Sequence, residues 1–300
     1  PQLAFMMERL MYAVNAKMEA AEAVKKLEAI LKESPLPEPS PAGRKSPADS
    51  SISFDNVTFT YDGAARPALM NVRFHLPQGA AYALVGPSGG GKSTIARLIP
   101  RFFDAQEGAV LVGGQDVRSI PAAELMEQIS FVFQEVHLFK KSIRDNIRAA
   151  RPNATEEEIL HAAQLAQCGD ILEKIPGGLD AVIGAKGVYL SGGEMQRIAL
   201  ARAILKDAPI VVLDEASSFA DPENEVKIQK AFEALMKGKT VLMIAHRLST
   251  VRRMDRILVI KKGVVVEEGK HDELIEKGGV YASMWEEYQS AAQWKVGGEA

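Results

Sequence analysis

The stretch GPSGGGKST, residues 86–94, decides the fold. Its four glycines let backbone N–H groups approach a polyphosphate closely, where larger side chains would block the way or resist a positive φ. Lys92 can then reach the terminal phosphates, and the hydroxyl of Ser93 suits a Mg²⁺ ion. A loop that merely turns the chain has no need of this Lys–Ser pair. The stretch therefore predicts a nucleotide-binding loop rather than a structural turn.

The residues on either side supply the context that a phosphate loop requires. Ala80–Val85 is a short apolar run that predicts a buried strand, and a helix is expected from about Lys92 to Phe102. This helix directs its positive N-terminal end at the bound phosphates. The loop residues expected to hold the nucleotide are Gly86, Ser88, Gly89, Gly90, Gly91, Lys92, Ser93 and Thr94.

A second apolar strand, Ile210–Leu213, ends in the adjacent carboxylates Asp214 and Glu215. Ligands of open α/β sheets bind at the carboxyl ends of the strands, so both side chains are expected beside the phosphates. Asp214 suits the shell of a Mg²⁺ ion, and Glu215 suits a base that orients or deprotonates a water aimed at the γ-phosphate. The pair of carboxylates favours attack of water on the γ-phosphate over transfer of the phosphate to an acceptor. The alternative is two solvated carboxylates at a strand end.

The segment Leu190–Glu194, with the sequence LSGGE, opens a helix that is expected to run to about Lys206. A hydroxyl and two glycines at a helix N-terminus form a second anion site in the same chain. One nucleotide does not need two such sites. Ser191 is therefore either an ordinary N-cap or, with Gly192 and Gly193, a contact for a nucleotide held by another copy of the chain.

Strands and helices alternate along much of the chain after about residue 52. Ile52–Phe59 and Val72–Leu76 have strand-like spacing, Val241–Ile244 is a further buried strand, and a helix is expected near residues 223–236. This order predicts an α/β domain of the P-loop NTPase class with a mostly parallel central sheet. Residues from about 142 to 202 have a helical pattern and are interpreted as a helical subdomain inserted in that core.

The first 51 residues differ from this domain. Residues 1–33 are expected to form one amphipathic helix, because apolar residues recur at steps of three and four. This helix either packs on its own domain or is the cytoplasmic end of a last transmembrane helix. Residues 34–51 carry five prolines and five serines and are interpreted as an extended linker. The recurring apolar residues are Leu3, Met7, Leu10, Met11, Val14, Met18, Ala21, Leu27 and Leu31.

The composition narrows the class of protein. The 300 residues are 47% hydrophobic and 25% charged, which is enough for one or two globular domains with proper cores. A net charge of −3 lacks the basic balance of a nucleic-acid-binding domain, so no nucleic-acid partner is expected. Cys168 is the single cysteine, which rules out a disulfide within the chain and indicates a reducing compartment. No apolar run of about 18 residues occurs, so no membrane span is expected.

In their order, these motifs resemble the nucleotide-binding domain of an ATP-binding cassette (ABC) transporter, over about residues 52–288. Residues 86–94 resemble the Walker A loop, residues 190–194 the family signature, and residues 210–215 the Walker B strand. Residues 218–221 occupy the position of the D-loop. The resemblance implies an antiparallel β subdomain, a mostly parallel RecA-like core sheet and an inserted helical subdomain.

Three single residues take their roles from this resemblance. Tyr61 resembles the aromatic residue that stacks on adenine. Gln134 resembles the glutamine that contacts Mg²⁺ and senses the transmembrane part, and His246 resembles the histidine that contacts the γ-phosphate. Taken alone, the three residues have plainer interpretations: a turn tyrosine, a strand-end glutamine and a hydrogen-bonded spacer.

The resemblance also implies a way of working. Two copies pair head to tail and enclose two ATP molecules with Mg²⁺, each between the Walker A loop of one copy and Ser191 of the other. Closure of the pair moves attached transmembrane helices, and hydrolysis reopens it. The implied function is ATP hydrolysis that powers transmembrane transport at the cytoplasmic face of the cell membrane. The implied partners are a second nucleotide-binding domain, identical or different, and a transmembrane domain.

The type of cassette is similar to exporter-type half-transporters, in which a membrane domain, a long helix and a linker precede the cassette. Residues 136–140 and 220–225 are similar to a subgroup of siderophore importers built on the exporter fold. One alternative is a soluble importer ATPase, against which residues 1–33 argue. Another is a non-transport cassette ATPase, but such proteins carry a long coiled-coil insert, for which the interval between Lys92 and Ser191 has no room.

The sequence departs from the family pattern in three places. Glu194 stands where the signature usually has Gln, which adds a negative charge near the partner's nucleotide. Phe219 is bulkier than the usual D-loop residue. Residues 184–187 read GAKG where exporters commonly have GERG.

Overall fold

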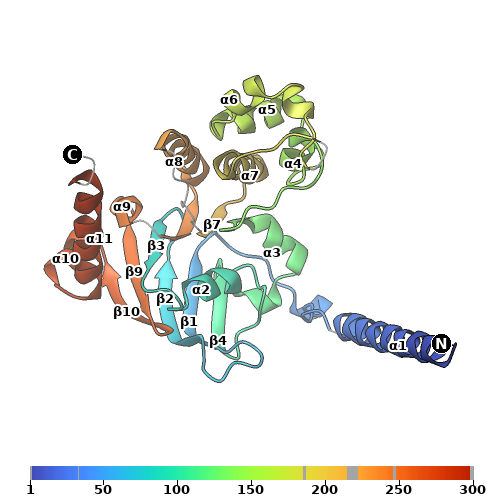
Figure 1. Ribbon diagram of the computed structural model, residues 1–300. Coiled ribbons are helices and arrows are strands. Elements are labelled where there is room, and N and C mark those ends of the chain that lie inside the picture. The colour runs from blue at the N-terminus through green and yellow to red at the C-terminus, as the bar shows by residue number, and fades with distance from the viewer. Residues whose placement is uncertain (1, 33, 185–186, 215–221, 246–247, 298–300) are drawn as a thin grey trace. The chain divides into compact units, whose positions relative to one another are not determined.

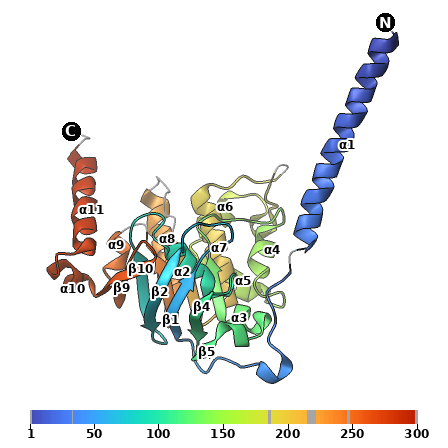
Figure 2. The same cartoon turned by 90° about the horizontal axis from the view of Figure 1, so that it is seen from below.

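The computed structural model describes residues 2–32, 34–184, 187–214, 222–245 and 248–297. The chain divides into two compact units, residues 1–37 and 38–300, and each is described by itself. Figures 1 and 2 give two views of the elements.

The first unit holds a single long helix, α1, Gln2–Lys32. None of its residues is buried, and large apolar side chains such as Met6 and Leu31 are exposed. Ion pairs one turn apart, Lys26 with Glu22 and Lys32 with Glu28, support the helix weakly. None of the helices described is both long and apolar enough to cross a bilayer. Because burial of an apolar face supplies most helix stability in proteins, α1 lacks the main source of such stability within its own unit.

The second unit is built on two β-sheets. In the smaller one all neighbouring pairs are antiparallel, in the order β2-β1-β4-β5. In the larger one β6, β7, β8, β3 and β9 run parallel, and only β10 is antiparallel to its neighbour, β9. The α/β class, with an antiparallel subdomain and a mostly parallel core sheet, is confirmed. The strands of the smaller sheet are β1 (Ile52–Phe59), β2 (Leu69–Leu76), β4 (Glu107–Val112) and β5 (Gln115–Asp116). The strands of the larger sheet are β3 (Ala81–Val85), β6 (Ile129–Val132), β7 (Ile210–Asp214), β8 (Thr240–Ile244), β9 (Arg256–Lys261) and β10 (Val264–Gly269).

The larger sheet is covered on both faces, which is why its strands are continuous apolar runs. Every residue of β7 is buried, and successive side chains point to opposite faces. Ile210 and Val212 join the cluster that contains α2 (Lys92–Leu98) and the smaller sheet. Val211 and Leu213 join the cluster beneath α7 (Gly192–Lys206) and α8 (Pro222–Met236). Helix α2 is thus held between the two sheets (Figure 1).

Helix α2 is shorter than the predicted span to Phe102 and ends at Leu98. A turn follows in which Arg101 has a φ of 58°. The Arg101 guanidinium is almost fully buried and bonds to Asp104 at 2.7 Å between Nε and Oδ1. This local ion pair fixes the turn, and no periodicity of apolar residues signals it.

Between β6 and β7 the chain forms the inserted helical subdomain, whose helices gather at the top of Figure 1. Cys168 lies in its core with no exposed surface, and burial raises the pKa of its thiol to about 12. The helices around this core are α4 (Ile143–Arg148), α5 (Glu156–Leu165), α6 (Gly169–Lys174) and α7. The remaining helices of the unit are α3 (Ala122–Gln128), α8, α9 (Leu248–Val251), α10 (His271–Glu276) and α11 (Val280–Gly297).

The stretch interpreted as a linker, residues 34–51, is bonded to the domain along its second half. The Lys45 N–H donates to the carbonyl of Ser119 at 2.9 Å, and the Ala48 N–H donates to the carbonyl of Gly113 at 3.1 Å. The buried hydroxyl of Ser50 lies 2.8 Å from that of Thr240. The compact unit therefore begins at residue 38 rather than at 52, because distant residues supply the partners that a Pro- and Ser-rich composition does not reveal.

Candidate functional site

The parallel strands bring the predicted site residues to one edge of the larger sheet. Pairing sets Leu84 of β3 opposite Ile244 of β8, and Ile244 opposite Asp214 of β7. Val132, the last residue of β6, is opposite Leu213. This edge of the sheet therefore carries three features in order. They are the loop after β3, the carboxylate of Asp214 at the end of β7, and exposed Gln134, two residues beyond β6.

Several predicted residues lie outside the part of the chain that is described. Glu215 comes directly after β7, and the D-loop, residues 218–221, follows it. His246 comes two residues after the end of β8. Their roles as base, crosstalk loop and γ-phosphate contact stay predictions.

Two glycines of the phosphate loop are required by the backbone packed against them. Gly86 has a φ of 139°, and a Cβ there would overlap the carbonyl oxygen of Ile260 on β9. Gly91, with a φ of 109°, is the residue before α2, and a Cβ there would lie 2.8 Å from Leu69 and 2.9 Å from the carbonyl of Ala68. The loop is therefore pressed between β9 and the start of β2, so its shape is set by neighbouring backbone.

Residues 89–94 of the loop, with Tyr61 and Ala68, line a cavity of about 240 Å³. The Lys92 side chain is only 8% exposed, and its ammonium donates to the carbonyls of Gly86 at 2.8 Å and Pro87 at 3.0 Å. Burial lowers the pKa of Lys92, and the nearby charge of Asp214 partly opposes this shift. Among the described residues, this buried ammonium is hydrogen-bonded by carbonyls of its own loop, and an incoming phosphate would offer it a charged partner. The lining residues are Tyr61, Ala68, Gly89, Gly90, Gly91, Lys92, Ser93 and Thr94.

Tyr61 borders the same cavity from the loop after β1. Its hydroxyl lies 3.1 Å from that of Thr94, in the first turn of α2. Its ring packs edge to face against Phe59 and Phe103, with ring centroids 4.8 and 5.3 Å away. These contacts hold the aromatic ring beside the loop, and stacking on adenine stays a prediction.

One residue near the loop gave no recognisable signal in the sequence. The Gly263 N–H, in the β9–β10 turn, donates to the carbonyl of Gly90 at 2.8 Å, while its carbonyl accepts from the Met70 N–H at 2.8 Å. The turn therefore ties the phosphate loop to β2. A glycine in a short hairpin is too common for its spacing alone to have indicated this contact.

The second anion site predicted from the sequence lies at the start of α7. Ser191 is the N-cap, and its hydroxyl accepts from the Glu194 N–H at 3.3 Å. The Glu194 carboxylate accepts in return from the Ser191 N–H at 2.7 Å, which completes a capping box. A Cβ on Gly193 would lie 3.2 Å from the side chain of Asn224, so this glycine allows α7 and α8 to approach closely.

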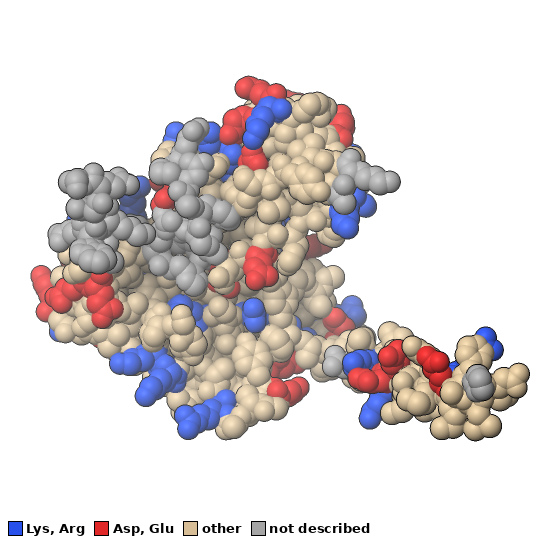
Figure 3. Space-filling view, in the orientation of Figure 1, with Lys and Arg blue, Asp and Glu red and all other residues tan. Residues whose placement is uncertain are grey.

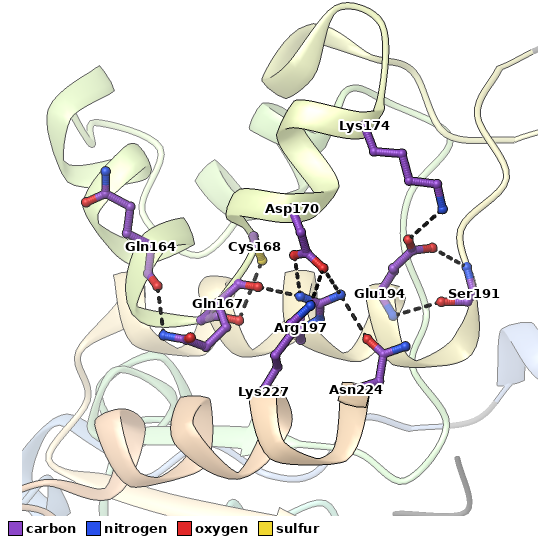
Figure 4. A network of polar contacts seen from close by, with 11 residues as sticks. Gln164, Gln167, Cys168, Asp170, Lys174, Ser191, Glu194, Arg197, Asn224 and Lys227 are labelled. Carbon is purple, nitrogen blue, oxygen red and sulfur yellow. Dashed lines mark hydrogen bonds and ion pairs between the residues drawn. The ribbon is translucent and has the colours of Figure 1, made fainter. Parts of the chain in front are cut away.

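Behind this cap lies a network of charges that the sequence did not suggest (Figure 4). The Arg197 side chain is 1% exposed and donates to the Asp170 carboxylate at 2.6 Å, to Asn224 at 3.0 Å and to the carbonyl of Gln167. Lys227 reaches the same carboxylate at 2.9 Å. Burial alone would raise the pKa of Asp170, but hydrogen bonds and charge from Arg197 and Lys227 lower it to about 2. The network joins α6, α7 and α8.

On the face drawn in Figure 3, side chains of both charge signs are interspersed over the helical subdomain, and uncharged groups cover much of the centre. Within the described ranges, no cluster of three or more His, Cys, Asp or Glu side chains could hold a metal ion by itself.

Comparisons with known proteins agree with this geometry. Residues 69–218, half of the chain, match the family model described as ABC transporter. The lipid A-core flippase of Escherichia coli (strain K12), described as ATP-dependent, is 50% identical over 238 residues, which is 79% of this chain and 41% of that protein. The corresponding protein of Haemophilus ducreyi is 49% identical over 239 residues, with the same shares. This chain thus spans about 41% of the length of these curated relatives.

A solved structure described as a bacterial Atm1-family ABC exporter with ATP bound superposes with a TM-score of 0.80 and 36% identity. The superposition covers 90% of this chain and 47% of the exporter chain. The α/β fold, the phosphate loop at the edge of its parallel sheet and these similarities lead to one conclusion: this chain belongs to the ABC transporter family, as its ATP-binding domain.

Proposed function

We propose that this domain binds ATP with Mg²⁺ at the phosphate loop, hydrolyses it and thereby powers transport by a longer membrane protein. The observation that carries the proposal is the buried ammonium of Lys92 inside a glycine loop at the carboxyl edge of the parallel sheet. Such an ammonium is poised for phosphate oxygens. Family membership supports the same reading.

The side chains at this edge fit Mg²⁺ by their chemistry. The Ser93 hydroxyl, the Asp214 carboxylate and the Gln134 amide offer only oxygen atoms as ligands, which a hard cation prefers. Mg²⁺ is usually held by one or two carboxylates plus substrate phosphates, so one described carboxylate is sufficient. Bound there, the ion would neutralise charge on the phosphates. Glu215 would orient the attacking water, and His246 would contact the γ-phosphate.

Pairing of two domains supplies a role for the second anion site. Ser191 is exposed at the start of α7, Gly192 is half-buried and Gly193 is buried. In the head-to-tail arrangement this helix start contacts the nucleotide of the other copy. The positive end of a helix favours a terminal phosphate. ATP therefore acts as the ligand that joins the two copies.

A groove beside Gln134 suits a transmembrane partner. It encloses about 470 Å³, and Phe131, Phe133 and Phe139 contribute aromatic lining. Phe133 is 49% exposed and Phe139 is 57% exposed, which is unusual for side chains of this size. A segment of the membrane domain that enters this groove would sense movements of Gln134. We assign α1 to the cytoplasmic end of the last transmembrane helix, because its apolar side chains have no cover in its own unit.

The decisive experiment compares the parent chain with Glu215→Gln in ATP and Mg²⁺. The variant is expected to keep ATP binding, to lose turnover and to accumulate as a dimer, which sedimentation velocity measures. Hydrolysis at the parent rate would contradict the assignment of the base. Ser191→Arg in the same background is expected to block the dimer, and an undiminished dimer would contradict the head-to-tail pairing.

A further inference from the structure

The start of α7 has a close counterpart in the same chain. Helix α5 begins with a second capping box, in which the Thr155 N–H donates to Glu158 at 2.8 Å and the Thr155 hydroxyl accepts at 3.3 Å. The corresponding distances at Ser191 and Glu194 are 2.7 and 3.3 Å. Two helix starts thus share one local geometry, and any difference between them reflects their surroundings.

Both capping carboxylates have a basic neighbour, but the two pairs differ in burial. Glu158 is 44% exposed and pairs with Arg151 at 2.6 Å. Glu194 is only 12% exposed, and its partner is the ammonium of Lys174, 3.4 Å away at the end of α6 (Figure 4). Lys174 is 75% exposed, so its long side chain retains freedom to turn. The separation of 3.4 Å is also long for a charge-assisted hydrogen bond, so Lys174 can leave Glu194 at little cost.

Glu194 places a fixed negative charge at a helix start that would otherwise attract anions. Burial would raise its pKa, but the hydrogen bonds from Ser191 and the charge of Lys174 lower it, so the carboxylate stays ionised at neutral pH. It also occupies the Ser191 N–H, so a ligand at this helix start is left with the Ser191 hydroxyl hydrogen and the N–H groups of Gly192 and Gly193 as donors. A phosphate that reaches Ser191 therefore meets repulsion unless a cation accompanies it.

Lys174 is the described cation in contact with this carboxylate. We propose that Lys174 is an additional phosphate-binding residue of the Ser191 site, and that it turns from Glu194 to the terminal phosphate of the nucleotide held by a second copy of this chain. Glu194 lowers the affinity of that site, and Lys174 restores it. The inference rests on the head-to-tail pairing proposed above and extends it by two residues.

The experiment uses the full 300-residue chain with Glu215→Gln to prevent turnover. The ATP concentration that gives half-maximal dimer is measured by sedimentation velocity for Lys174→Ala, Lys174→Arg and Glu194→Gln. Lys174→Ala is expected to raise this concentration about tenfold, the usual size of one charge-assisted bond to phosphate. Lys174→Arg is expected to leave this ATP concentration near the parent value, and Glu194→Gln is expected to lower it. The ATP affinity of the isolated monomer is expected to remain unchanged in all three, because its own phosphate loop is intact.

The second capping box supplies matched controls. Arg151→Ala and Glu158→Gln remove the same types of charge at α5 and are expected to leave the dimer midpoint at the parent value. A Lys174→Ala midpoint equal to that of Arg151→Ala would overturn the inference, as would a change in monomer ATP affinity. If Ser191→Arg also dimerises normally, the pairing itself fails. If Ser191→Arg blocks the dimer while Lys174→Ala has no effect, only the role of Lys174 fails.

Discussion

The phosphate loop and the start of α7 are both candidate anion sites, but different interactions hold them in shape. In the loop, backbone packing dominates: Gly86 faces the carbonyl of Ile260, and Lys92 donates to the carbonyls of Gly86 and Pro87 in its own loop. At α7 side chains dominate, through the capping box of Ser191 and the charges around Arg197. The first site leaves a buried cation available to a ligand, whereas the second has most of its polar groups already paired.

Because of this difference, substitutions in the loop can affect ATP binding and the free energy of unfolding separately. A change of backbone shape in the loop should disturb the fold, whereas removal of the Lys92 charge should disturb only binding. At α7, side-chain changes should affect both stability and pairing by smaller amounts. Four predictions test this comparison, from the largest expected effect to the smallest.

Gly86→Ala is expected to lower the free energy of unfolding by more than about 3 kcal/mol, because the new Cβ overlaps the Ile260 carbonyl and the φ is strained. Gly89→Ala is the matched change in the same loop. Its φ of 72° also disfavours alanine, but nothing lies within 4 Å of the new Cβ, so a loss of about 1–2 kcal/mol is expected. Urea denaturation measures both. Equal losses would show that packing against β9 does not set the shape of the loop.

Lys92→Ala is expected to weaken ATP binding about 100-fold, which corresponds to the loss of a strong charge-assisted contact. The free energy of unfolding is expected to change by less than about 1 kcal/mol, because a partly desolvated ammonium is removed along with two hydrogen bonds. Equilibrium dialysis with ATP and urea denaturation separate the two effects. Unchanged ATP affinity would contradict the phosphate cradle.

Asp170→Asn is expected to lower the stability of the second unit at pH 7 by about 1 kcal/mol. The full shift of the Asp170 pKa to about 2 corresponds to a larger loss of stability, but this carboxylate is 44% exposed and solvent screens its interaction with Arg197. Because the folded-state pKa lies below the unfolded value, the contribution is present above about pH 4 and is lost as the pH falls toward 2. The parent should therefore lose this increment in acid while the variant does not. The measurement is the free energy of unfolding in urea at a series of pH values between about 4 and 2. If it falls equally with pH in the parent and in Asp170→Asn, the role of the Asp170–Arg197 pair is contradicted.

Ser191→Ala is expected to cost about 0.5 kcal/mol of stability, at the low end for an N-cap, because the Glu194 carboxylate still accepts from the backbone. Thr155→Ala removes the equivalent hydroxyl at α5 and should cost a similar amount. Only Ser191→Ala is expected to weaken ATP-driven pairing as well. If both variants weaken the dimer equally, the Ser191 hydroxyl acts only as a helix cap.

The local patterns predicted most of the fold. Gly86–Thr94 follows a buried strand and opens a helix, and Ile210–Asp214 is a fully buried strand, so short apolar runs and turn chemistry were sufficient for both. The helical subdomain was predicted from its lack of strands. Lipid A-core flippases appear among the relatives, and the siderophore subgroup stays a prediction.

What the sequence did not reveal depends on distant partners of ordinary residues. Ser50 bonds to Thr240, Gly263 bonds to Gly90, and Arg197 joins three helices. None of these residues has an unusual type or spacing, so local sequence carries no sign of its contacts. Within the site, the predicted residues Tyr61 and 89–94 line one cavity, Gly86 and Ser88 do not line it, and the roles of Glu215 and His246 stay predictions.

The burial of Cys168 makes the chain convenient for single-molecule work. Burial raises the pKa of this thiol to about 12, so the thiol stays protonated at pH 7, and the sulfur has no exposed surface to offer a maleimide dye. The natural cysteine therefore needs no replacement before labelling. A cysteine introduced at exposed Glu173, beside Lys174, would be the one reactive thiol and would report by energy transfer how closely two copies approach in ATP.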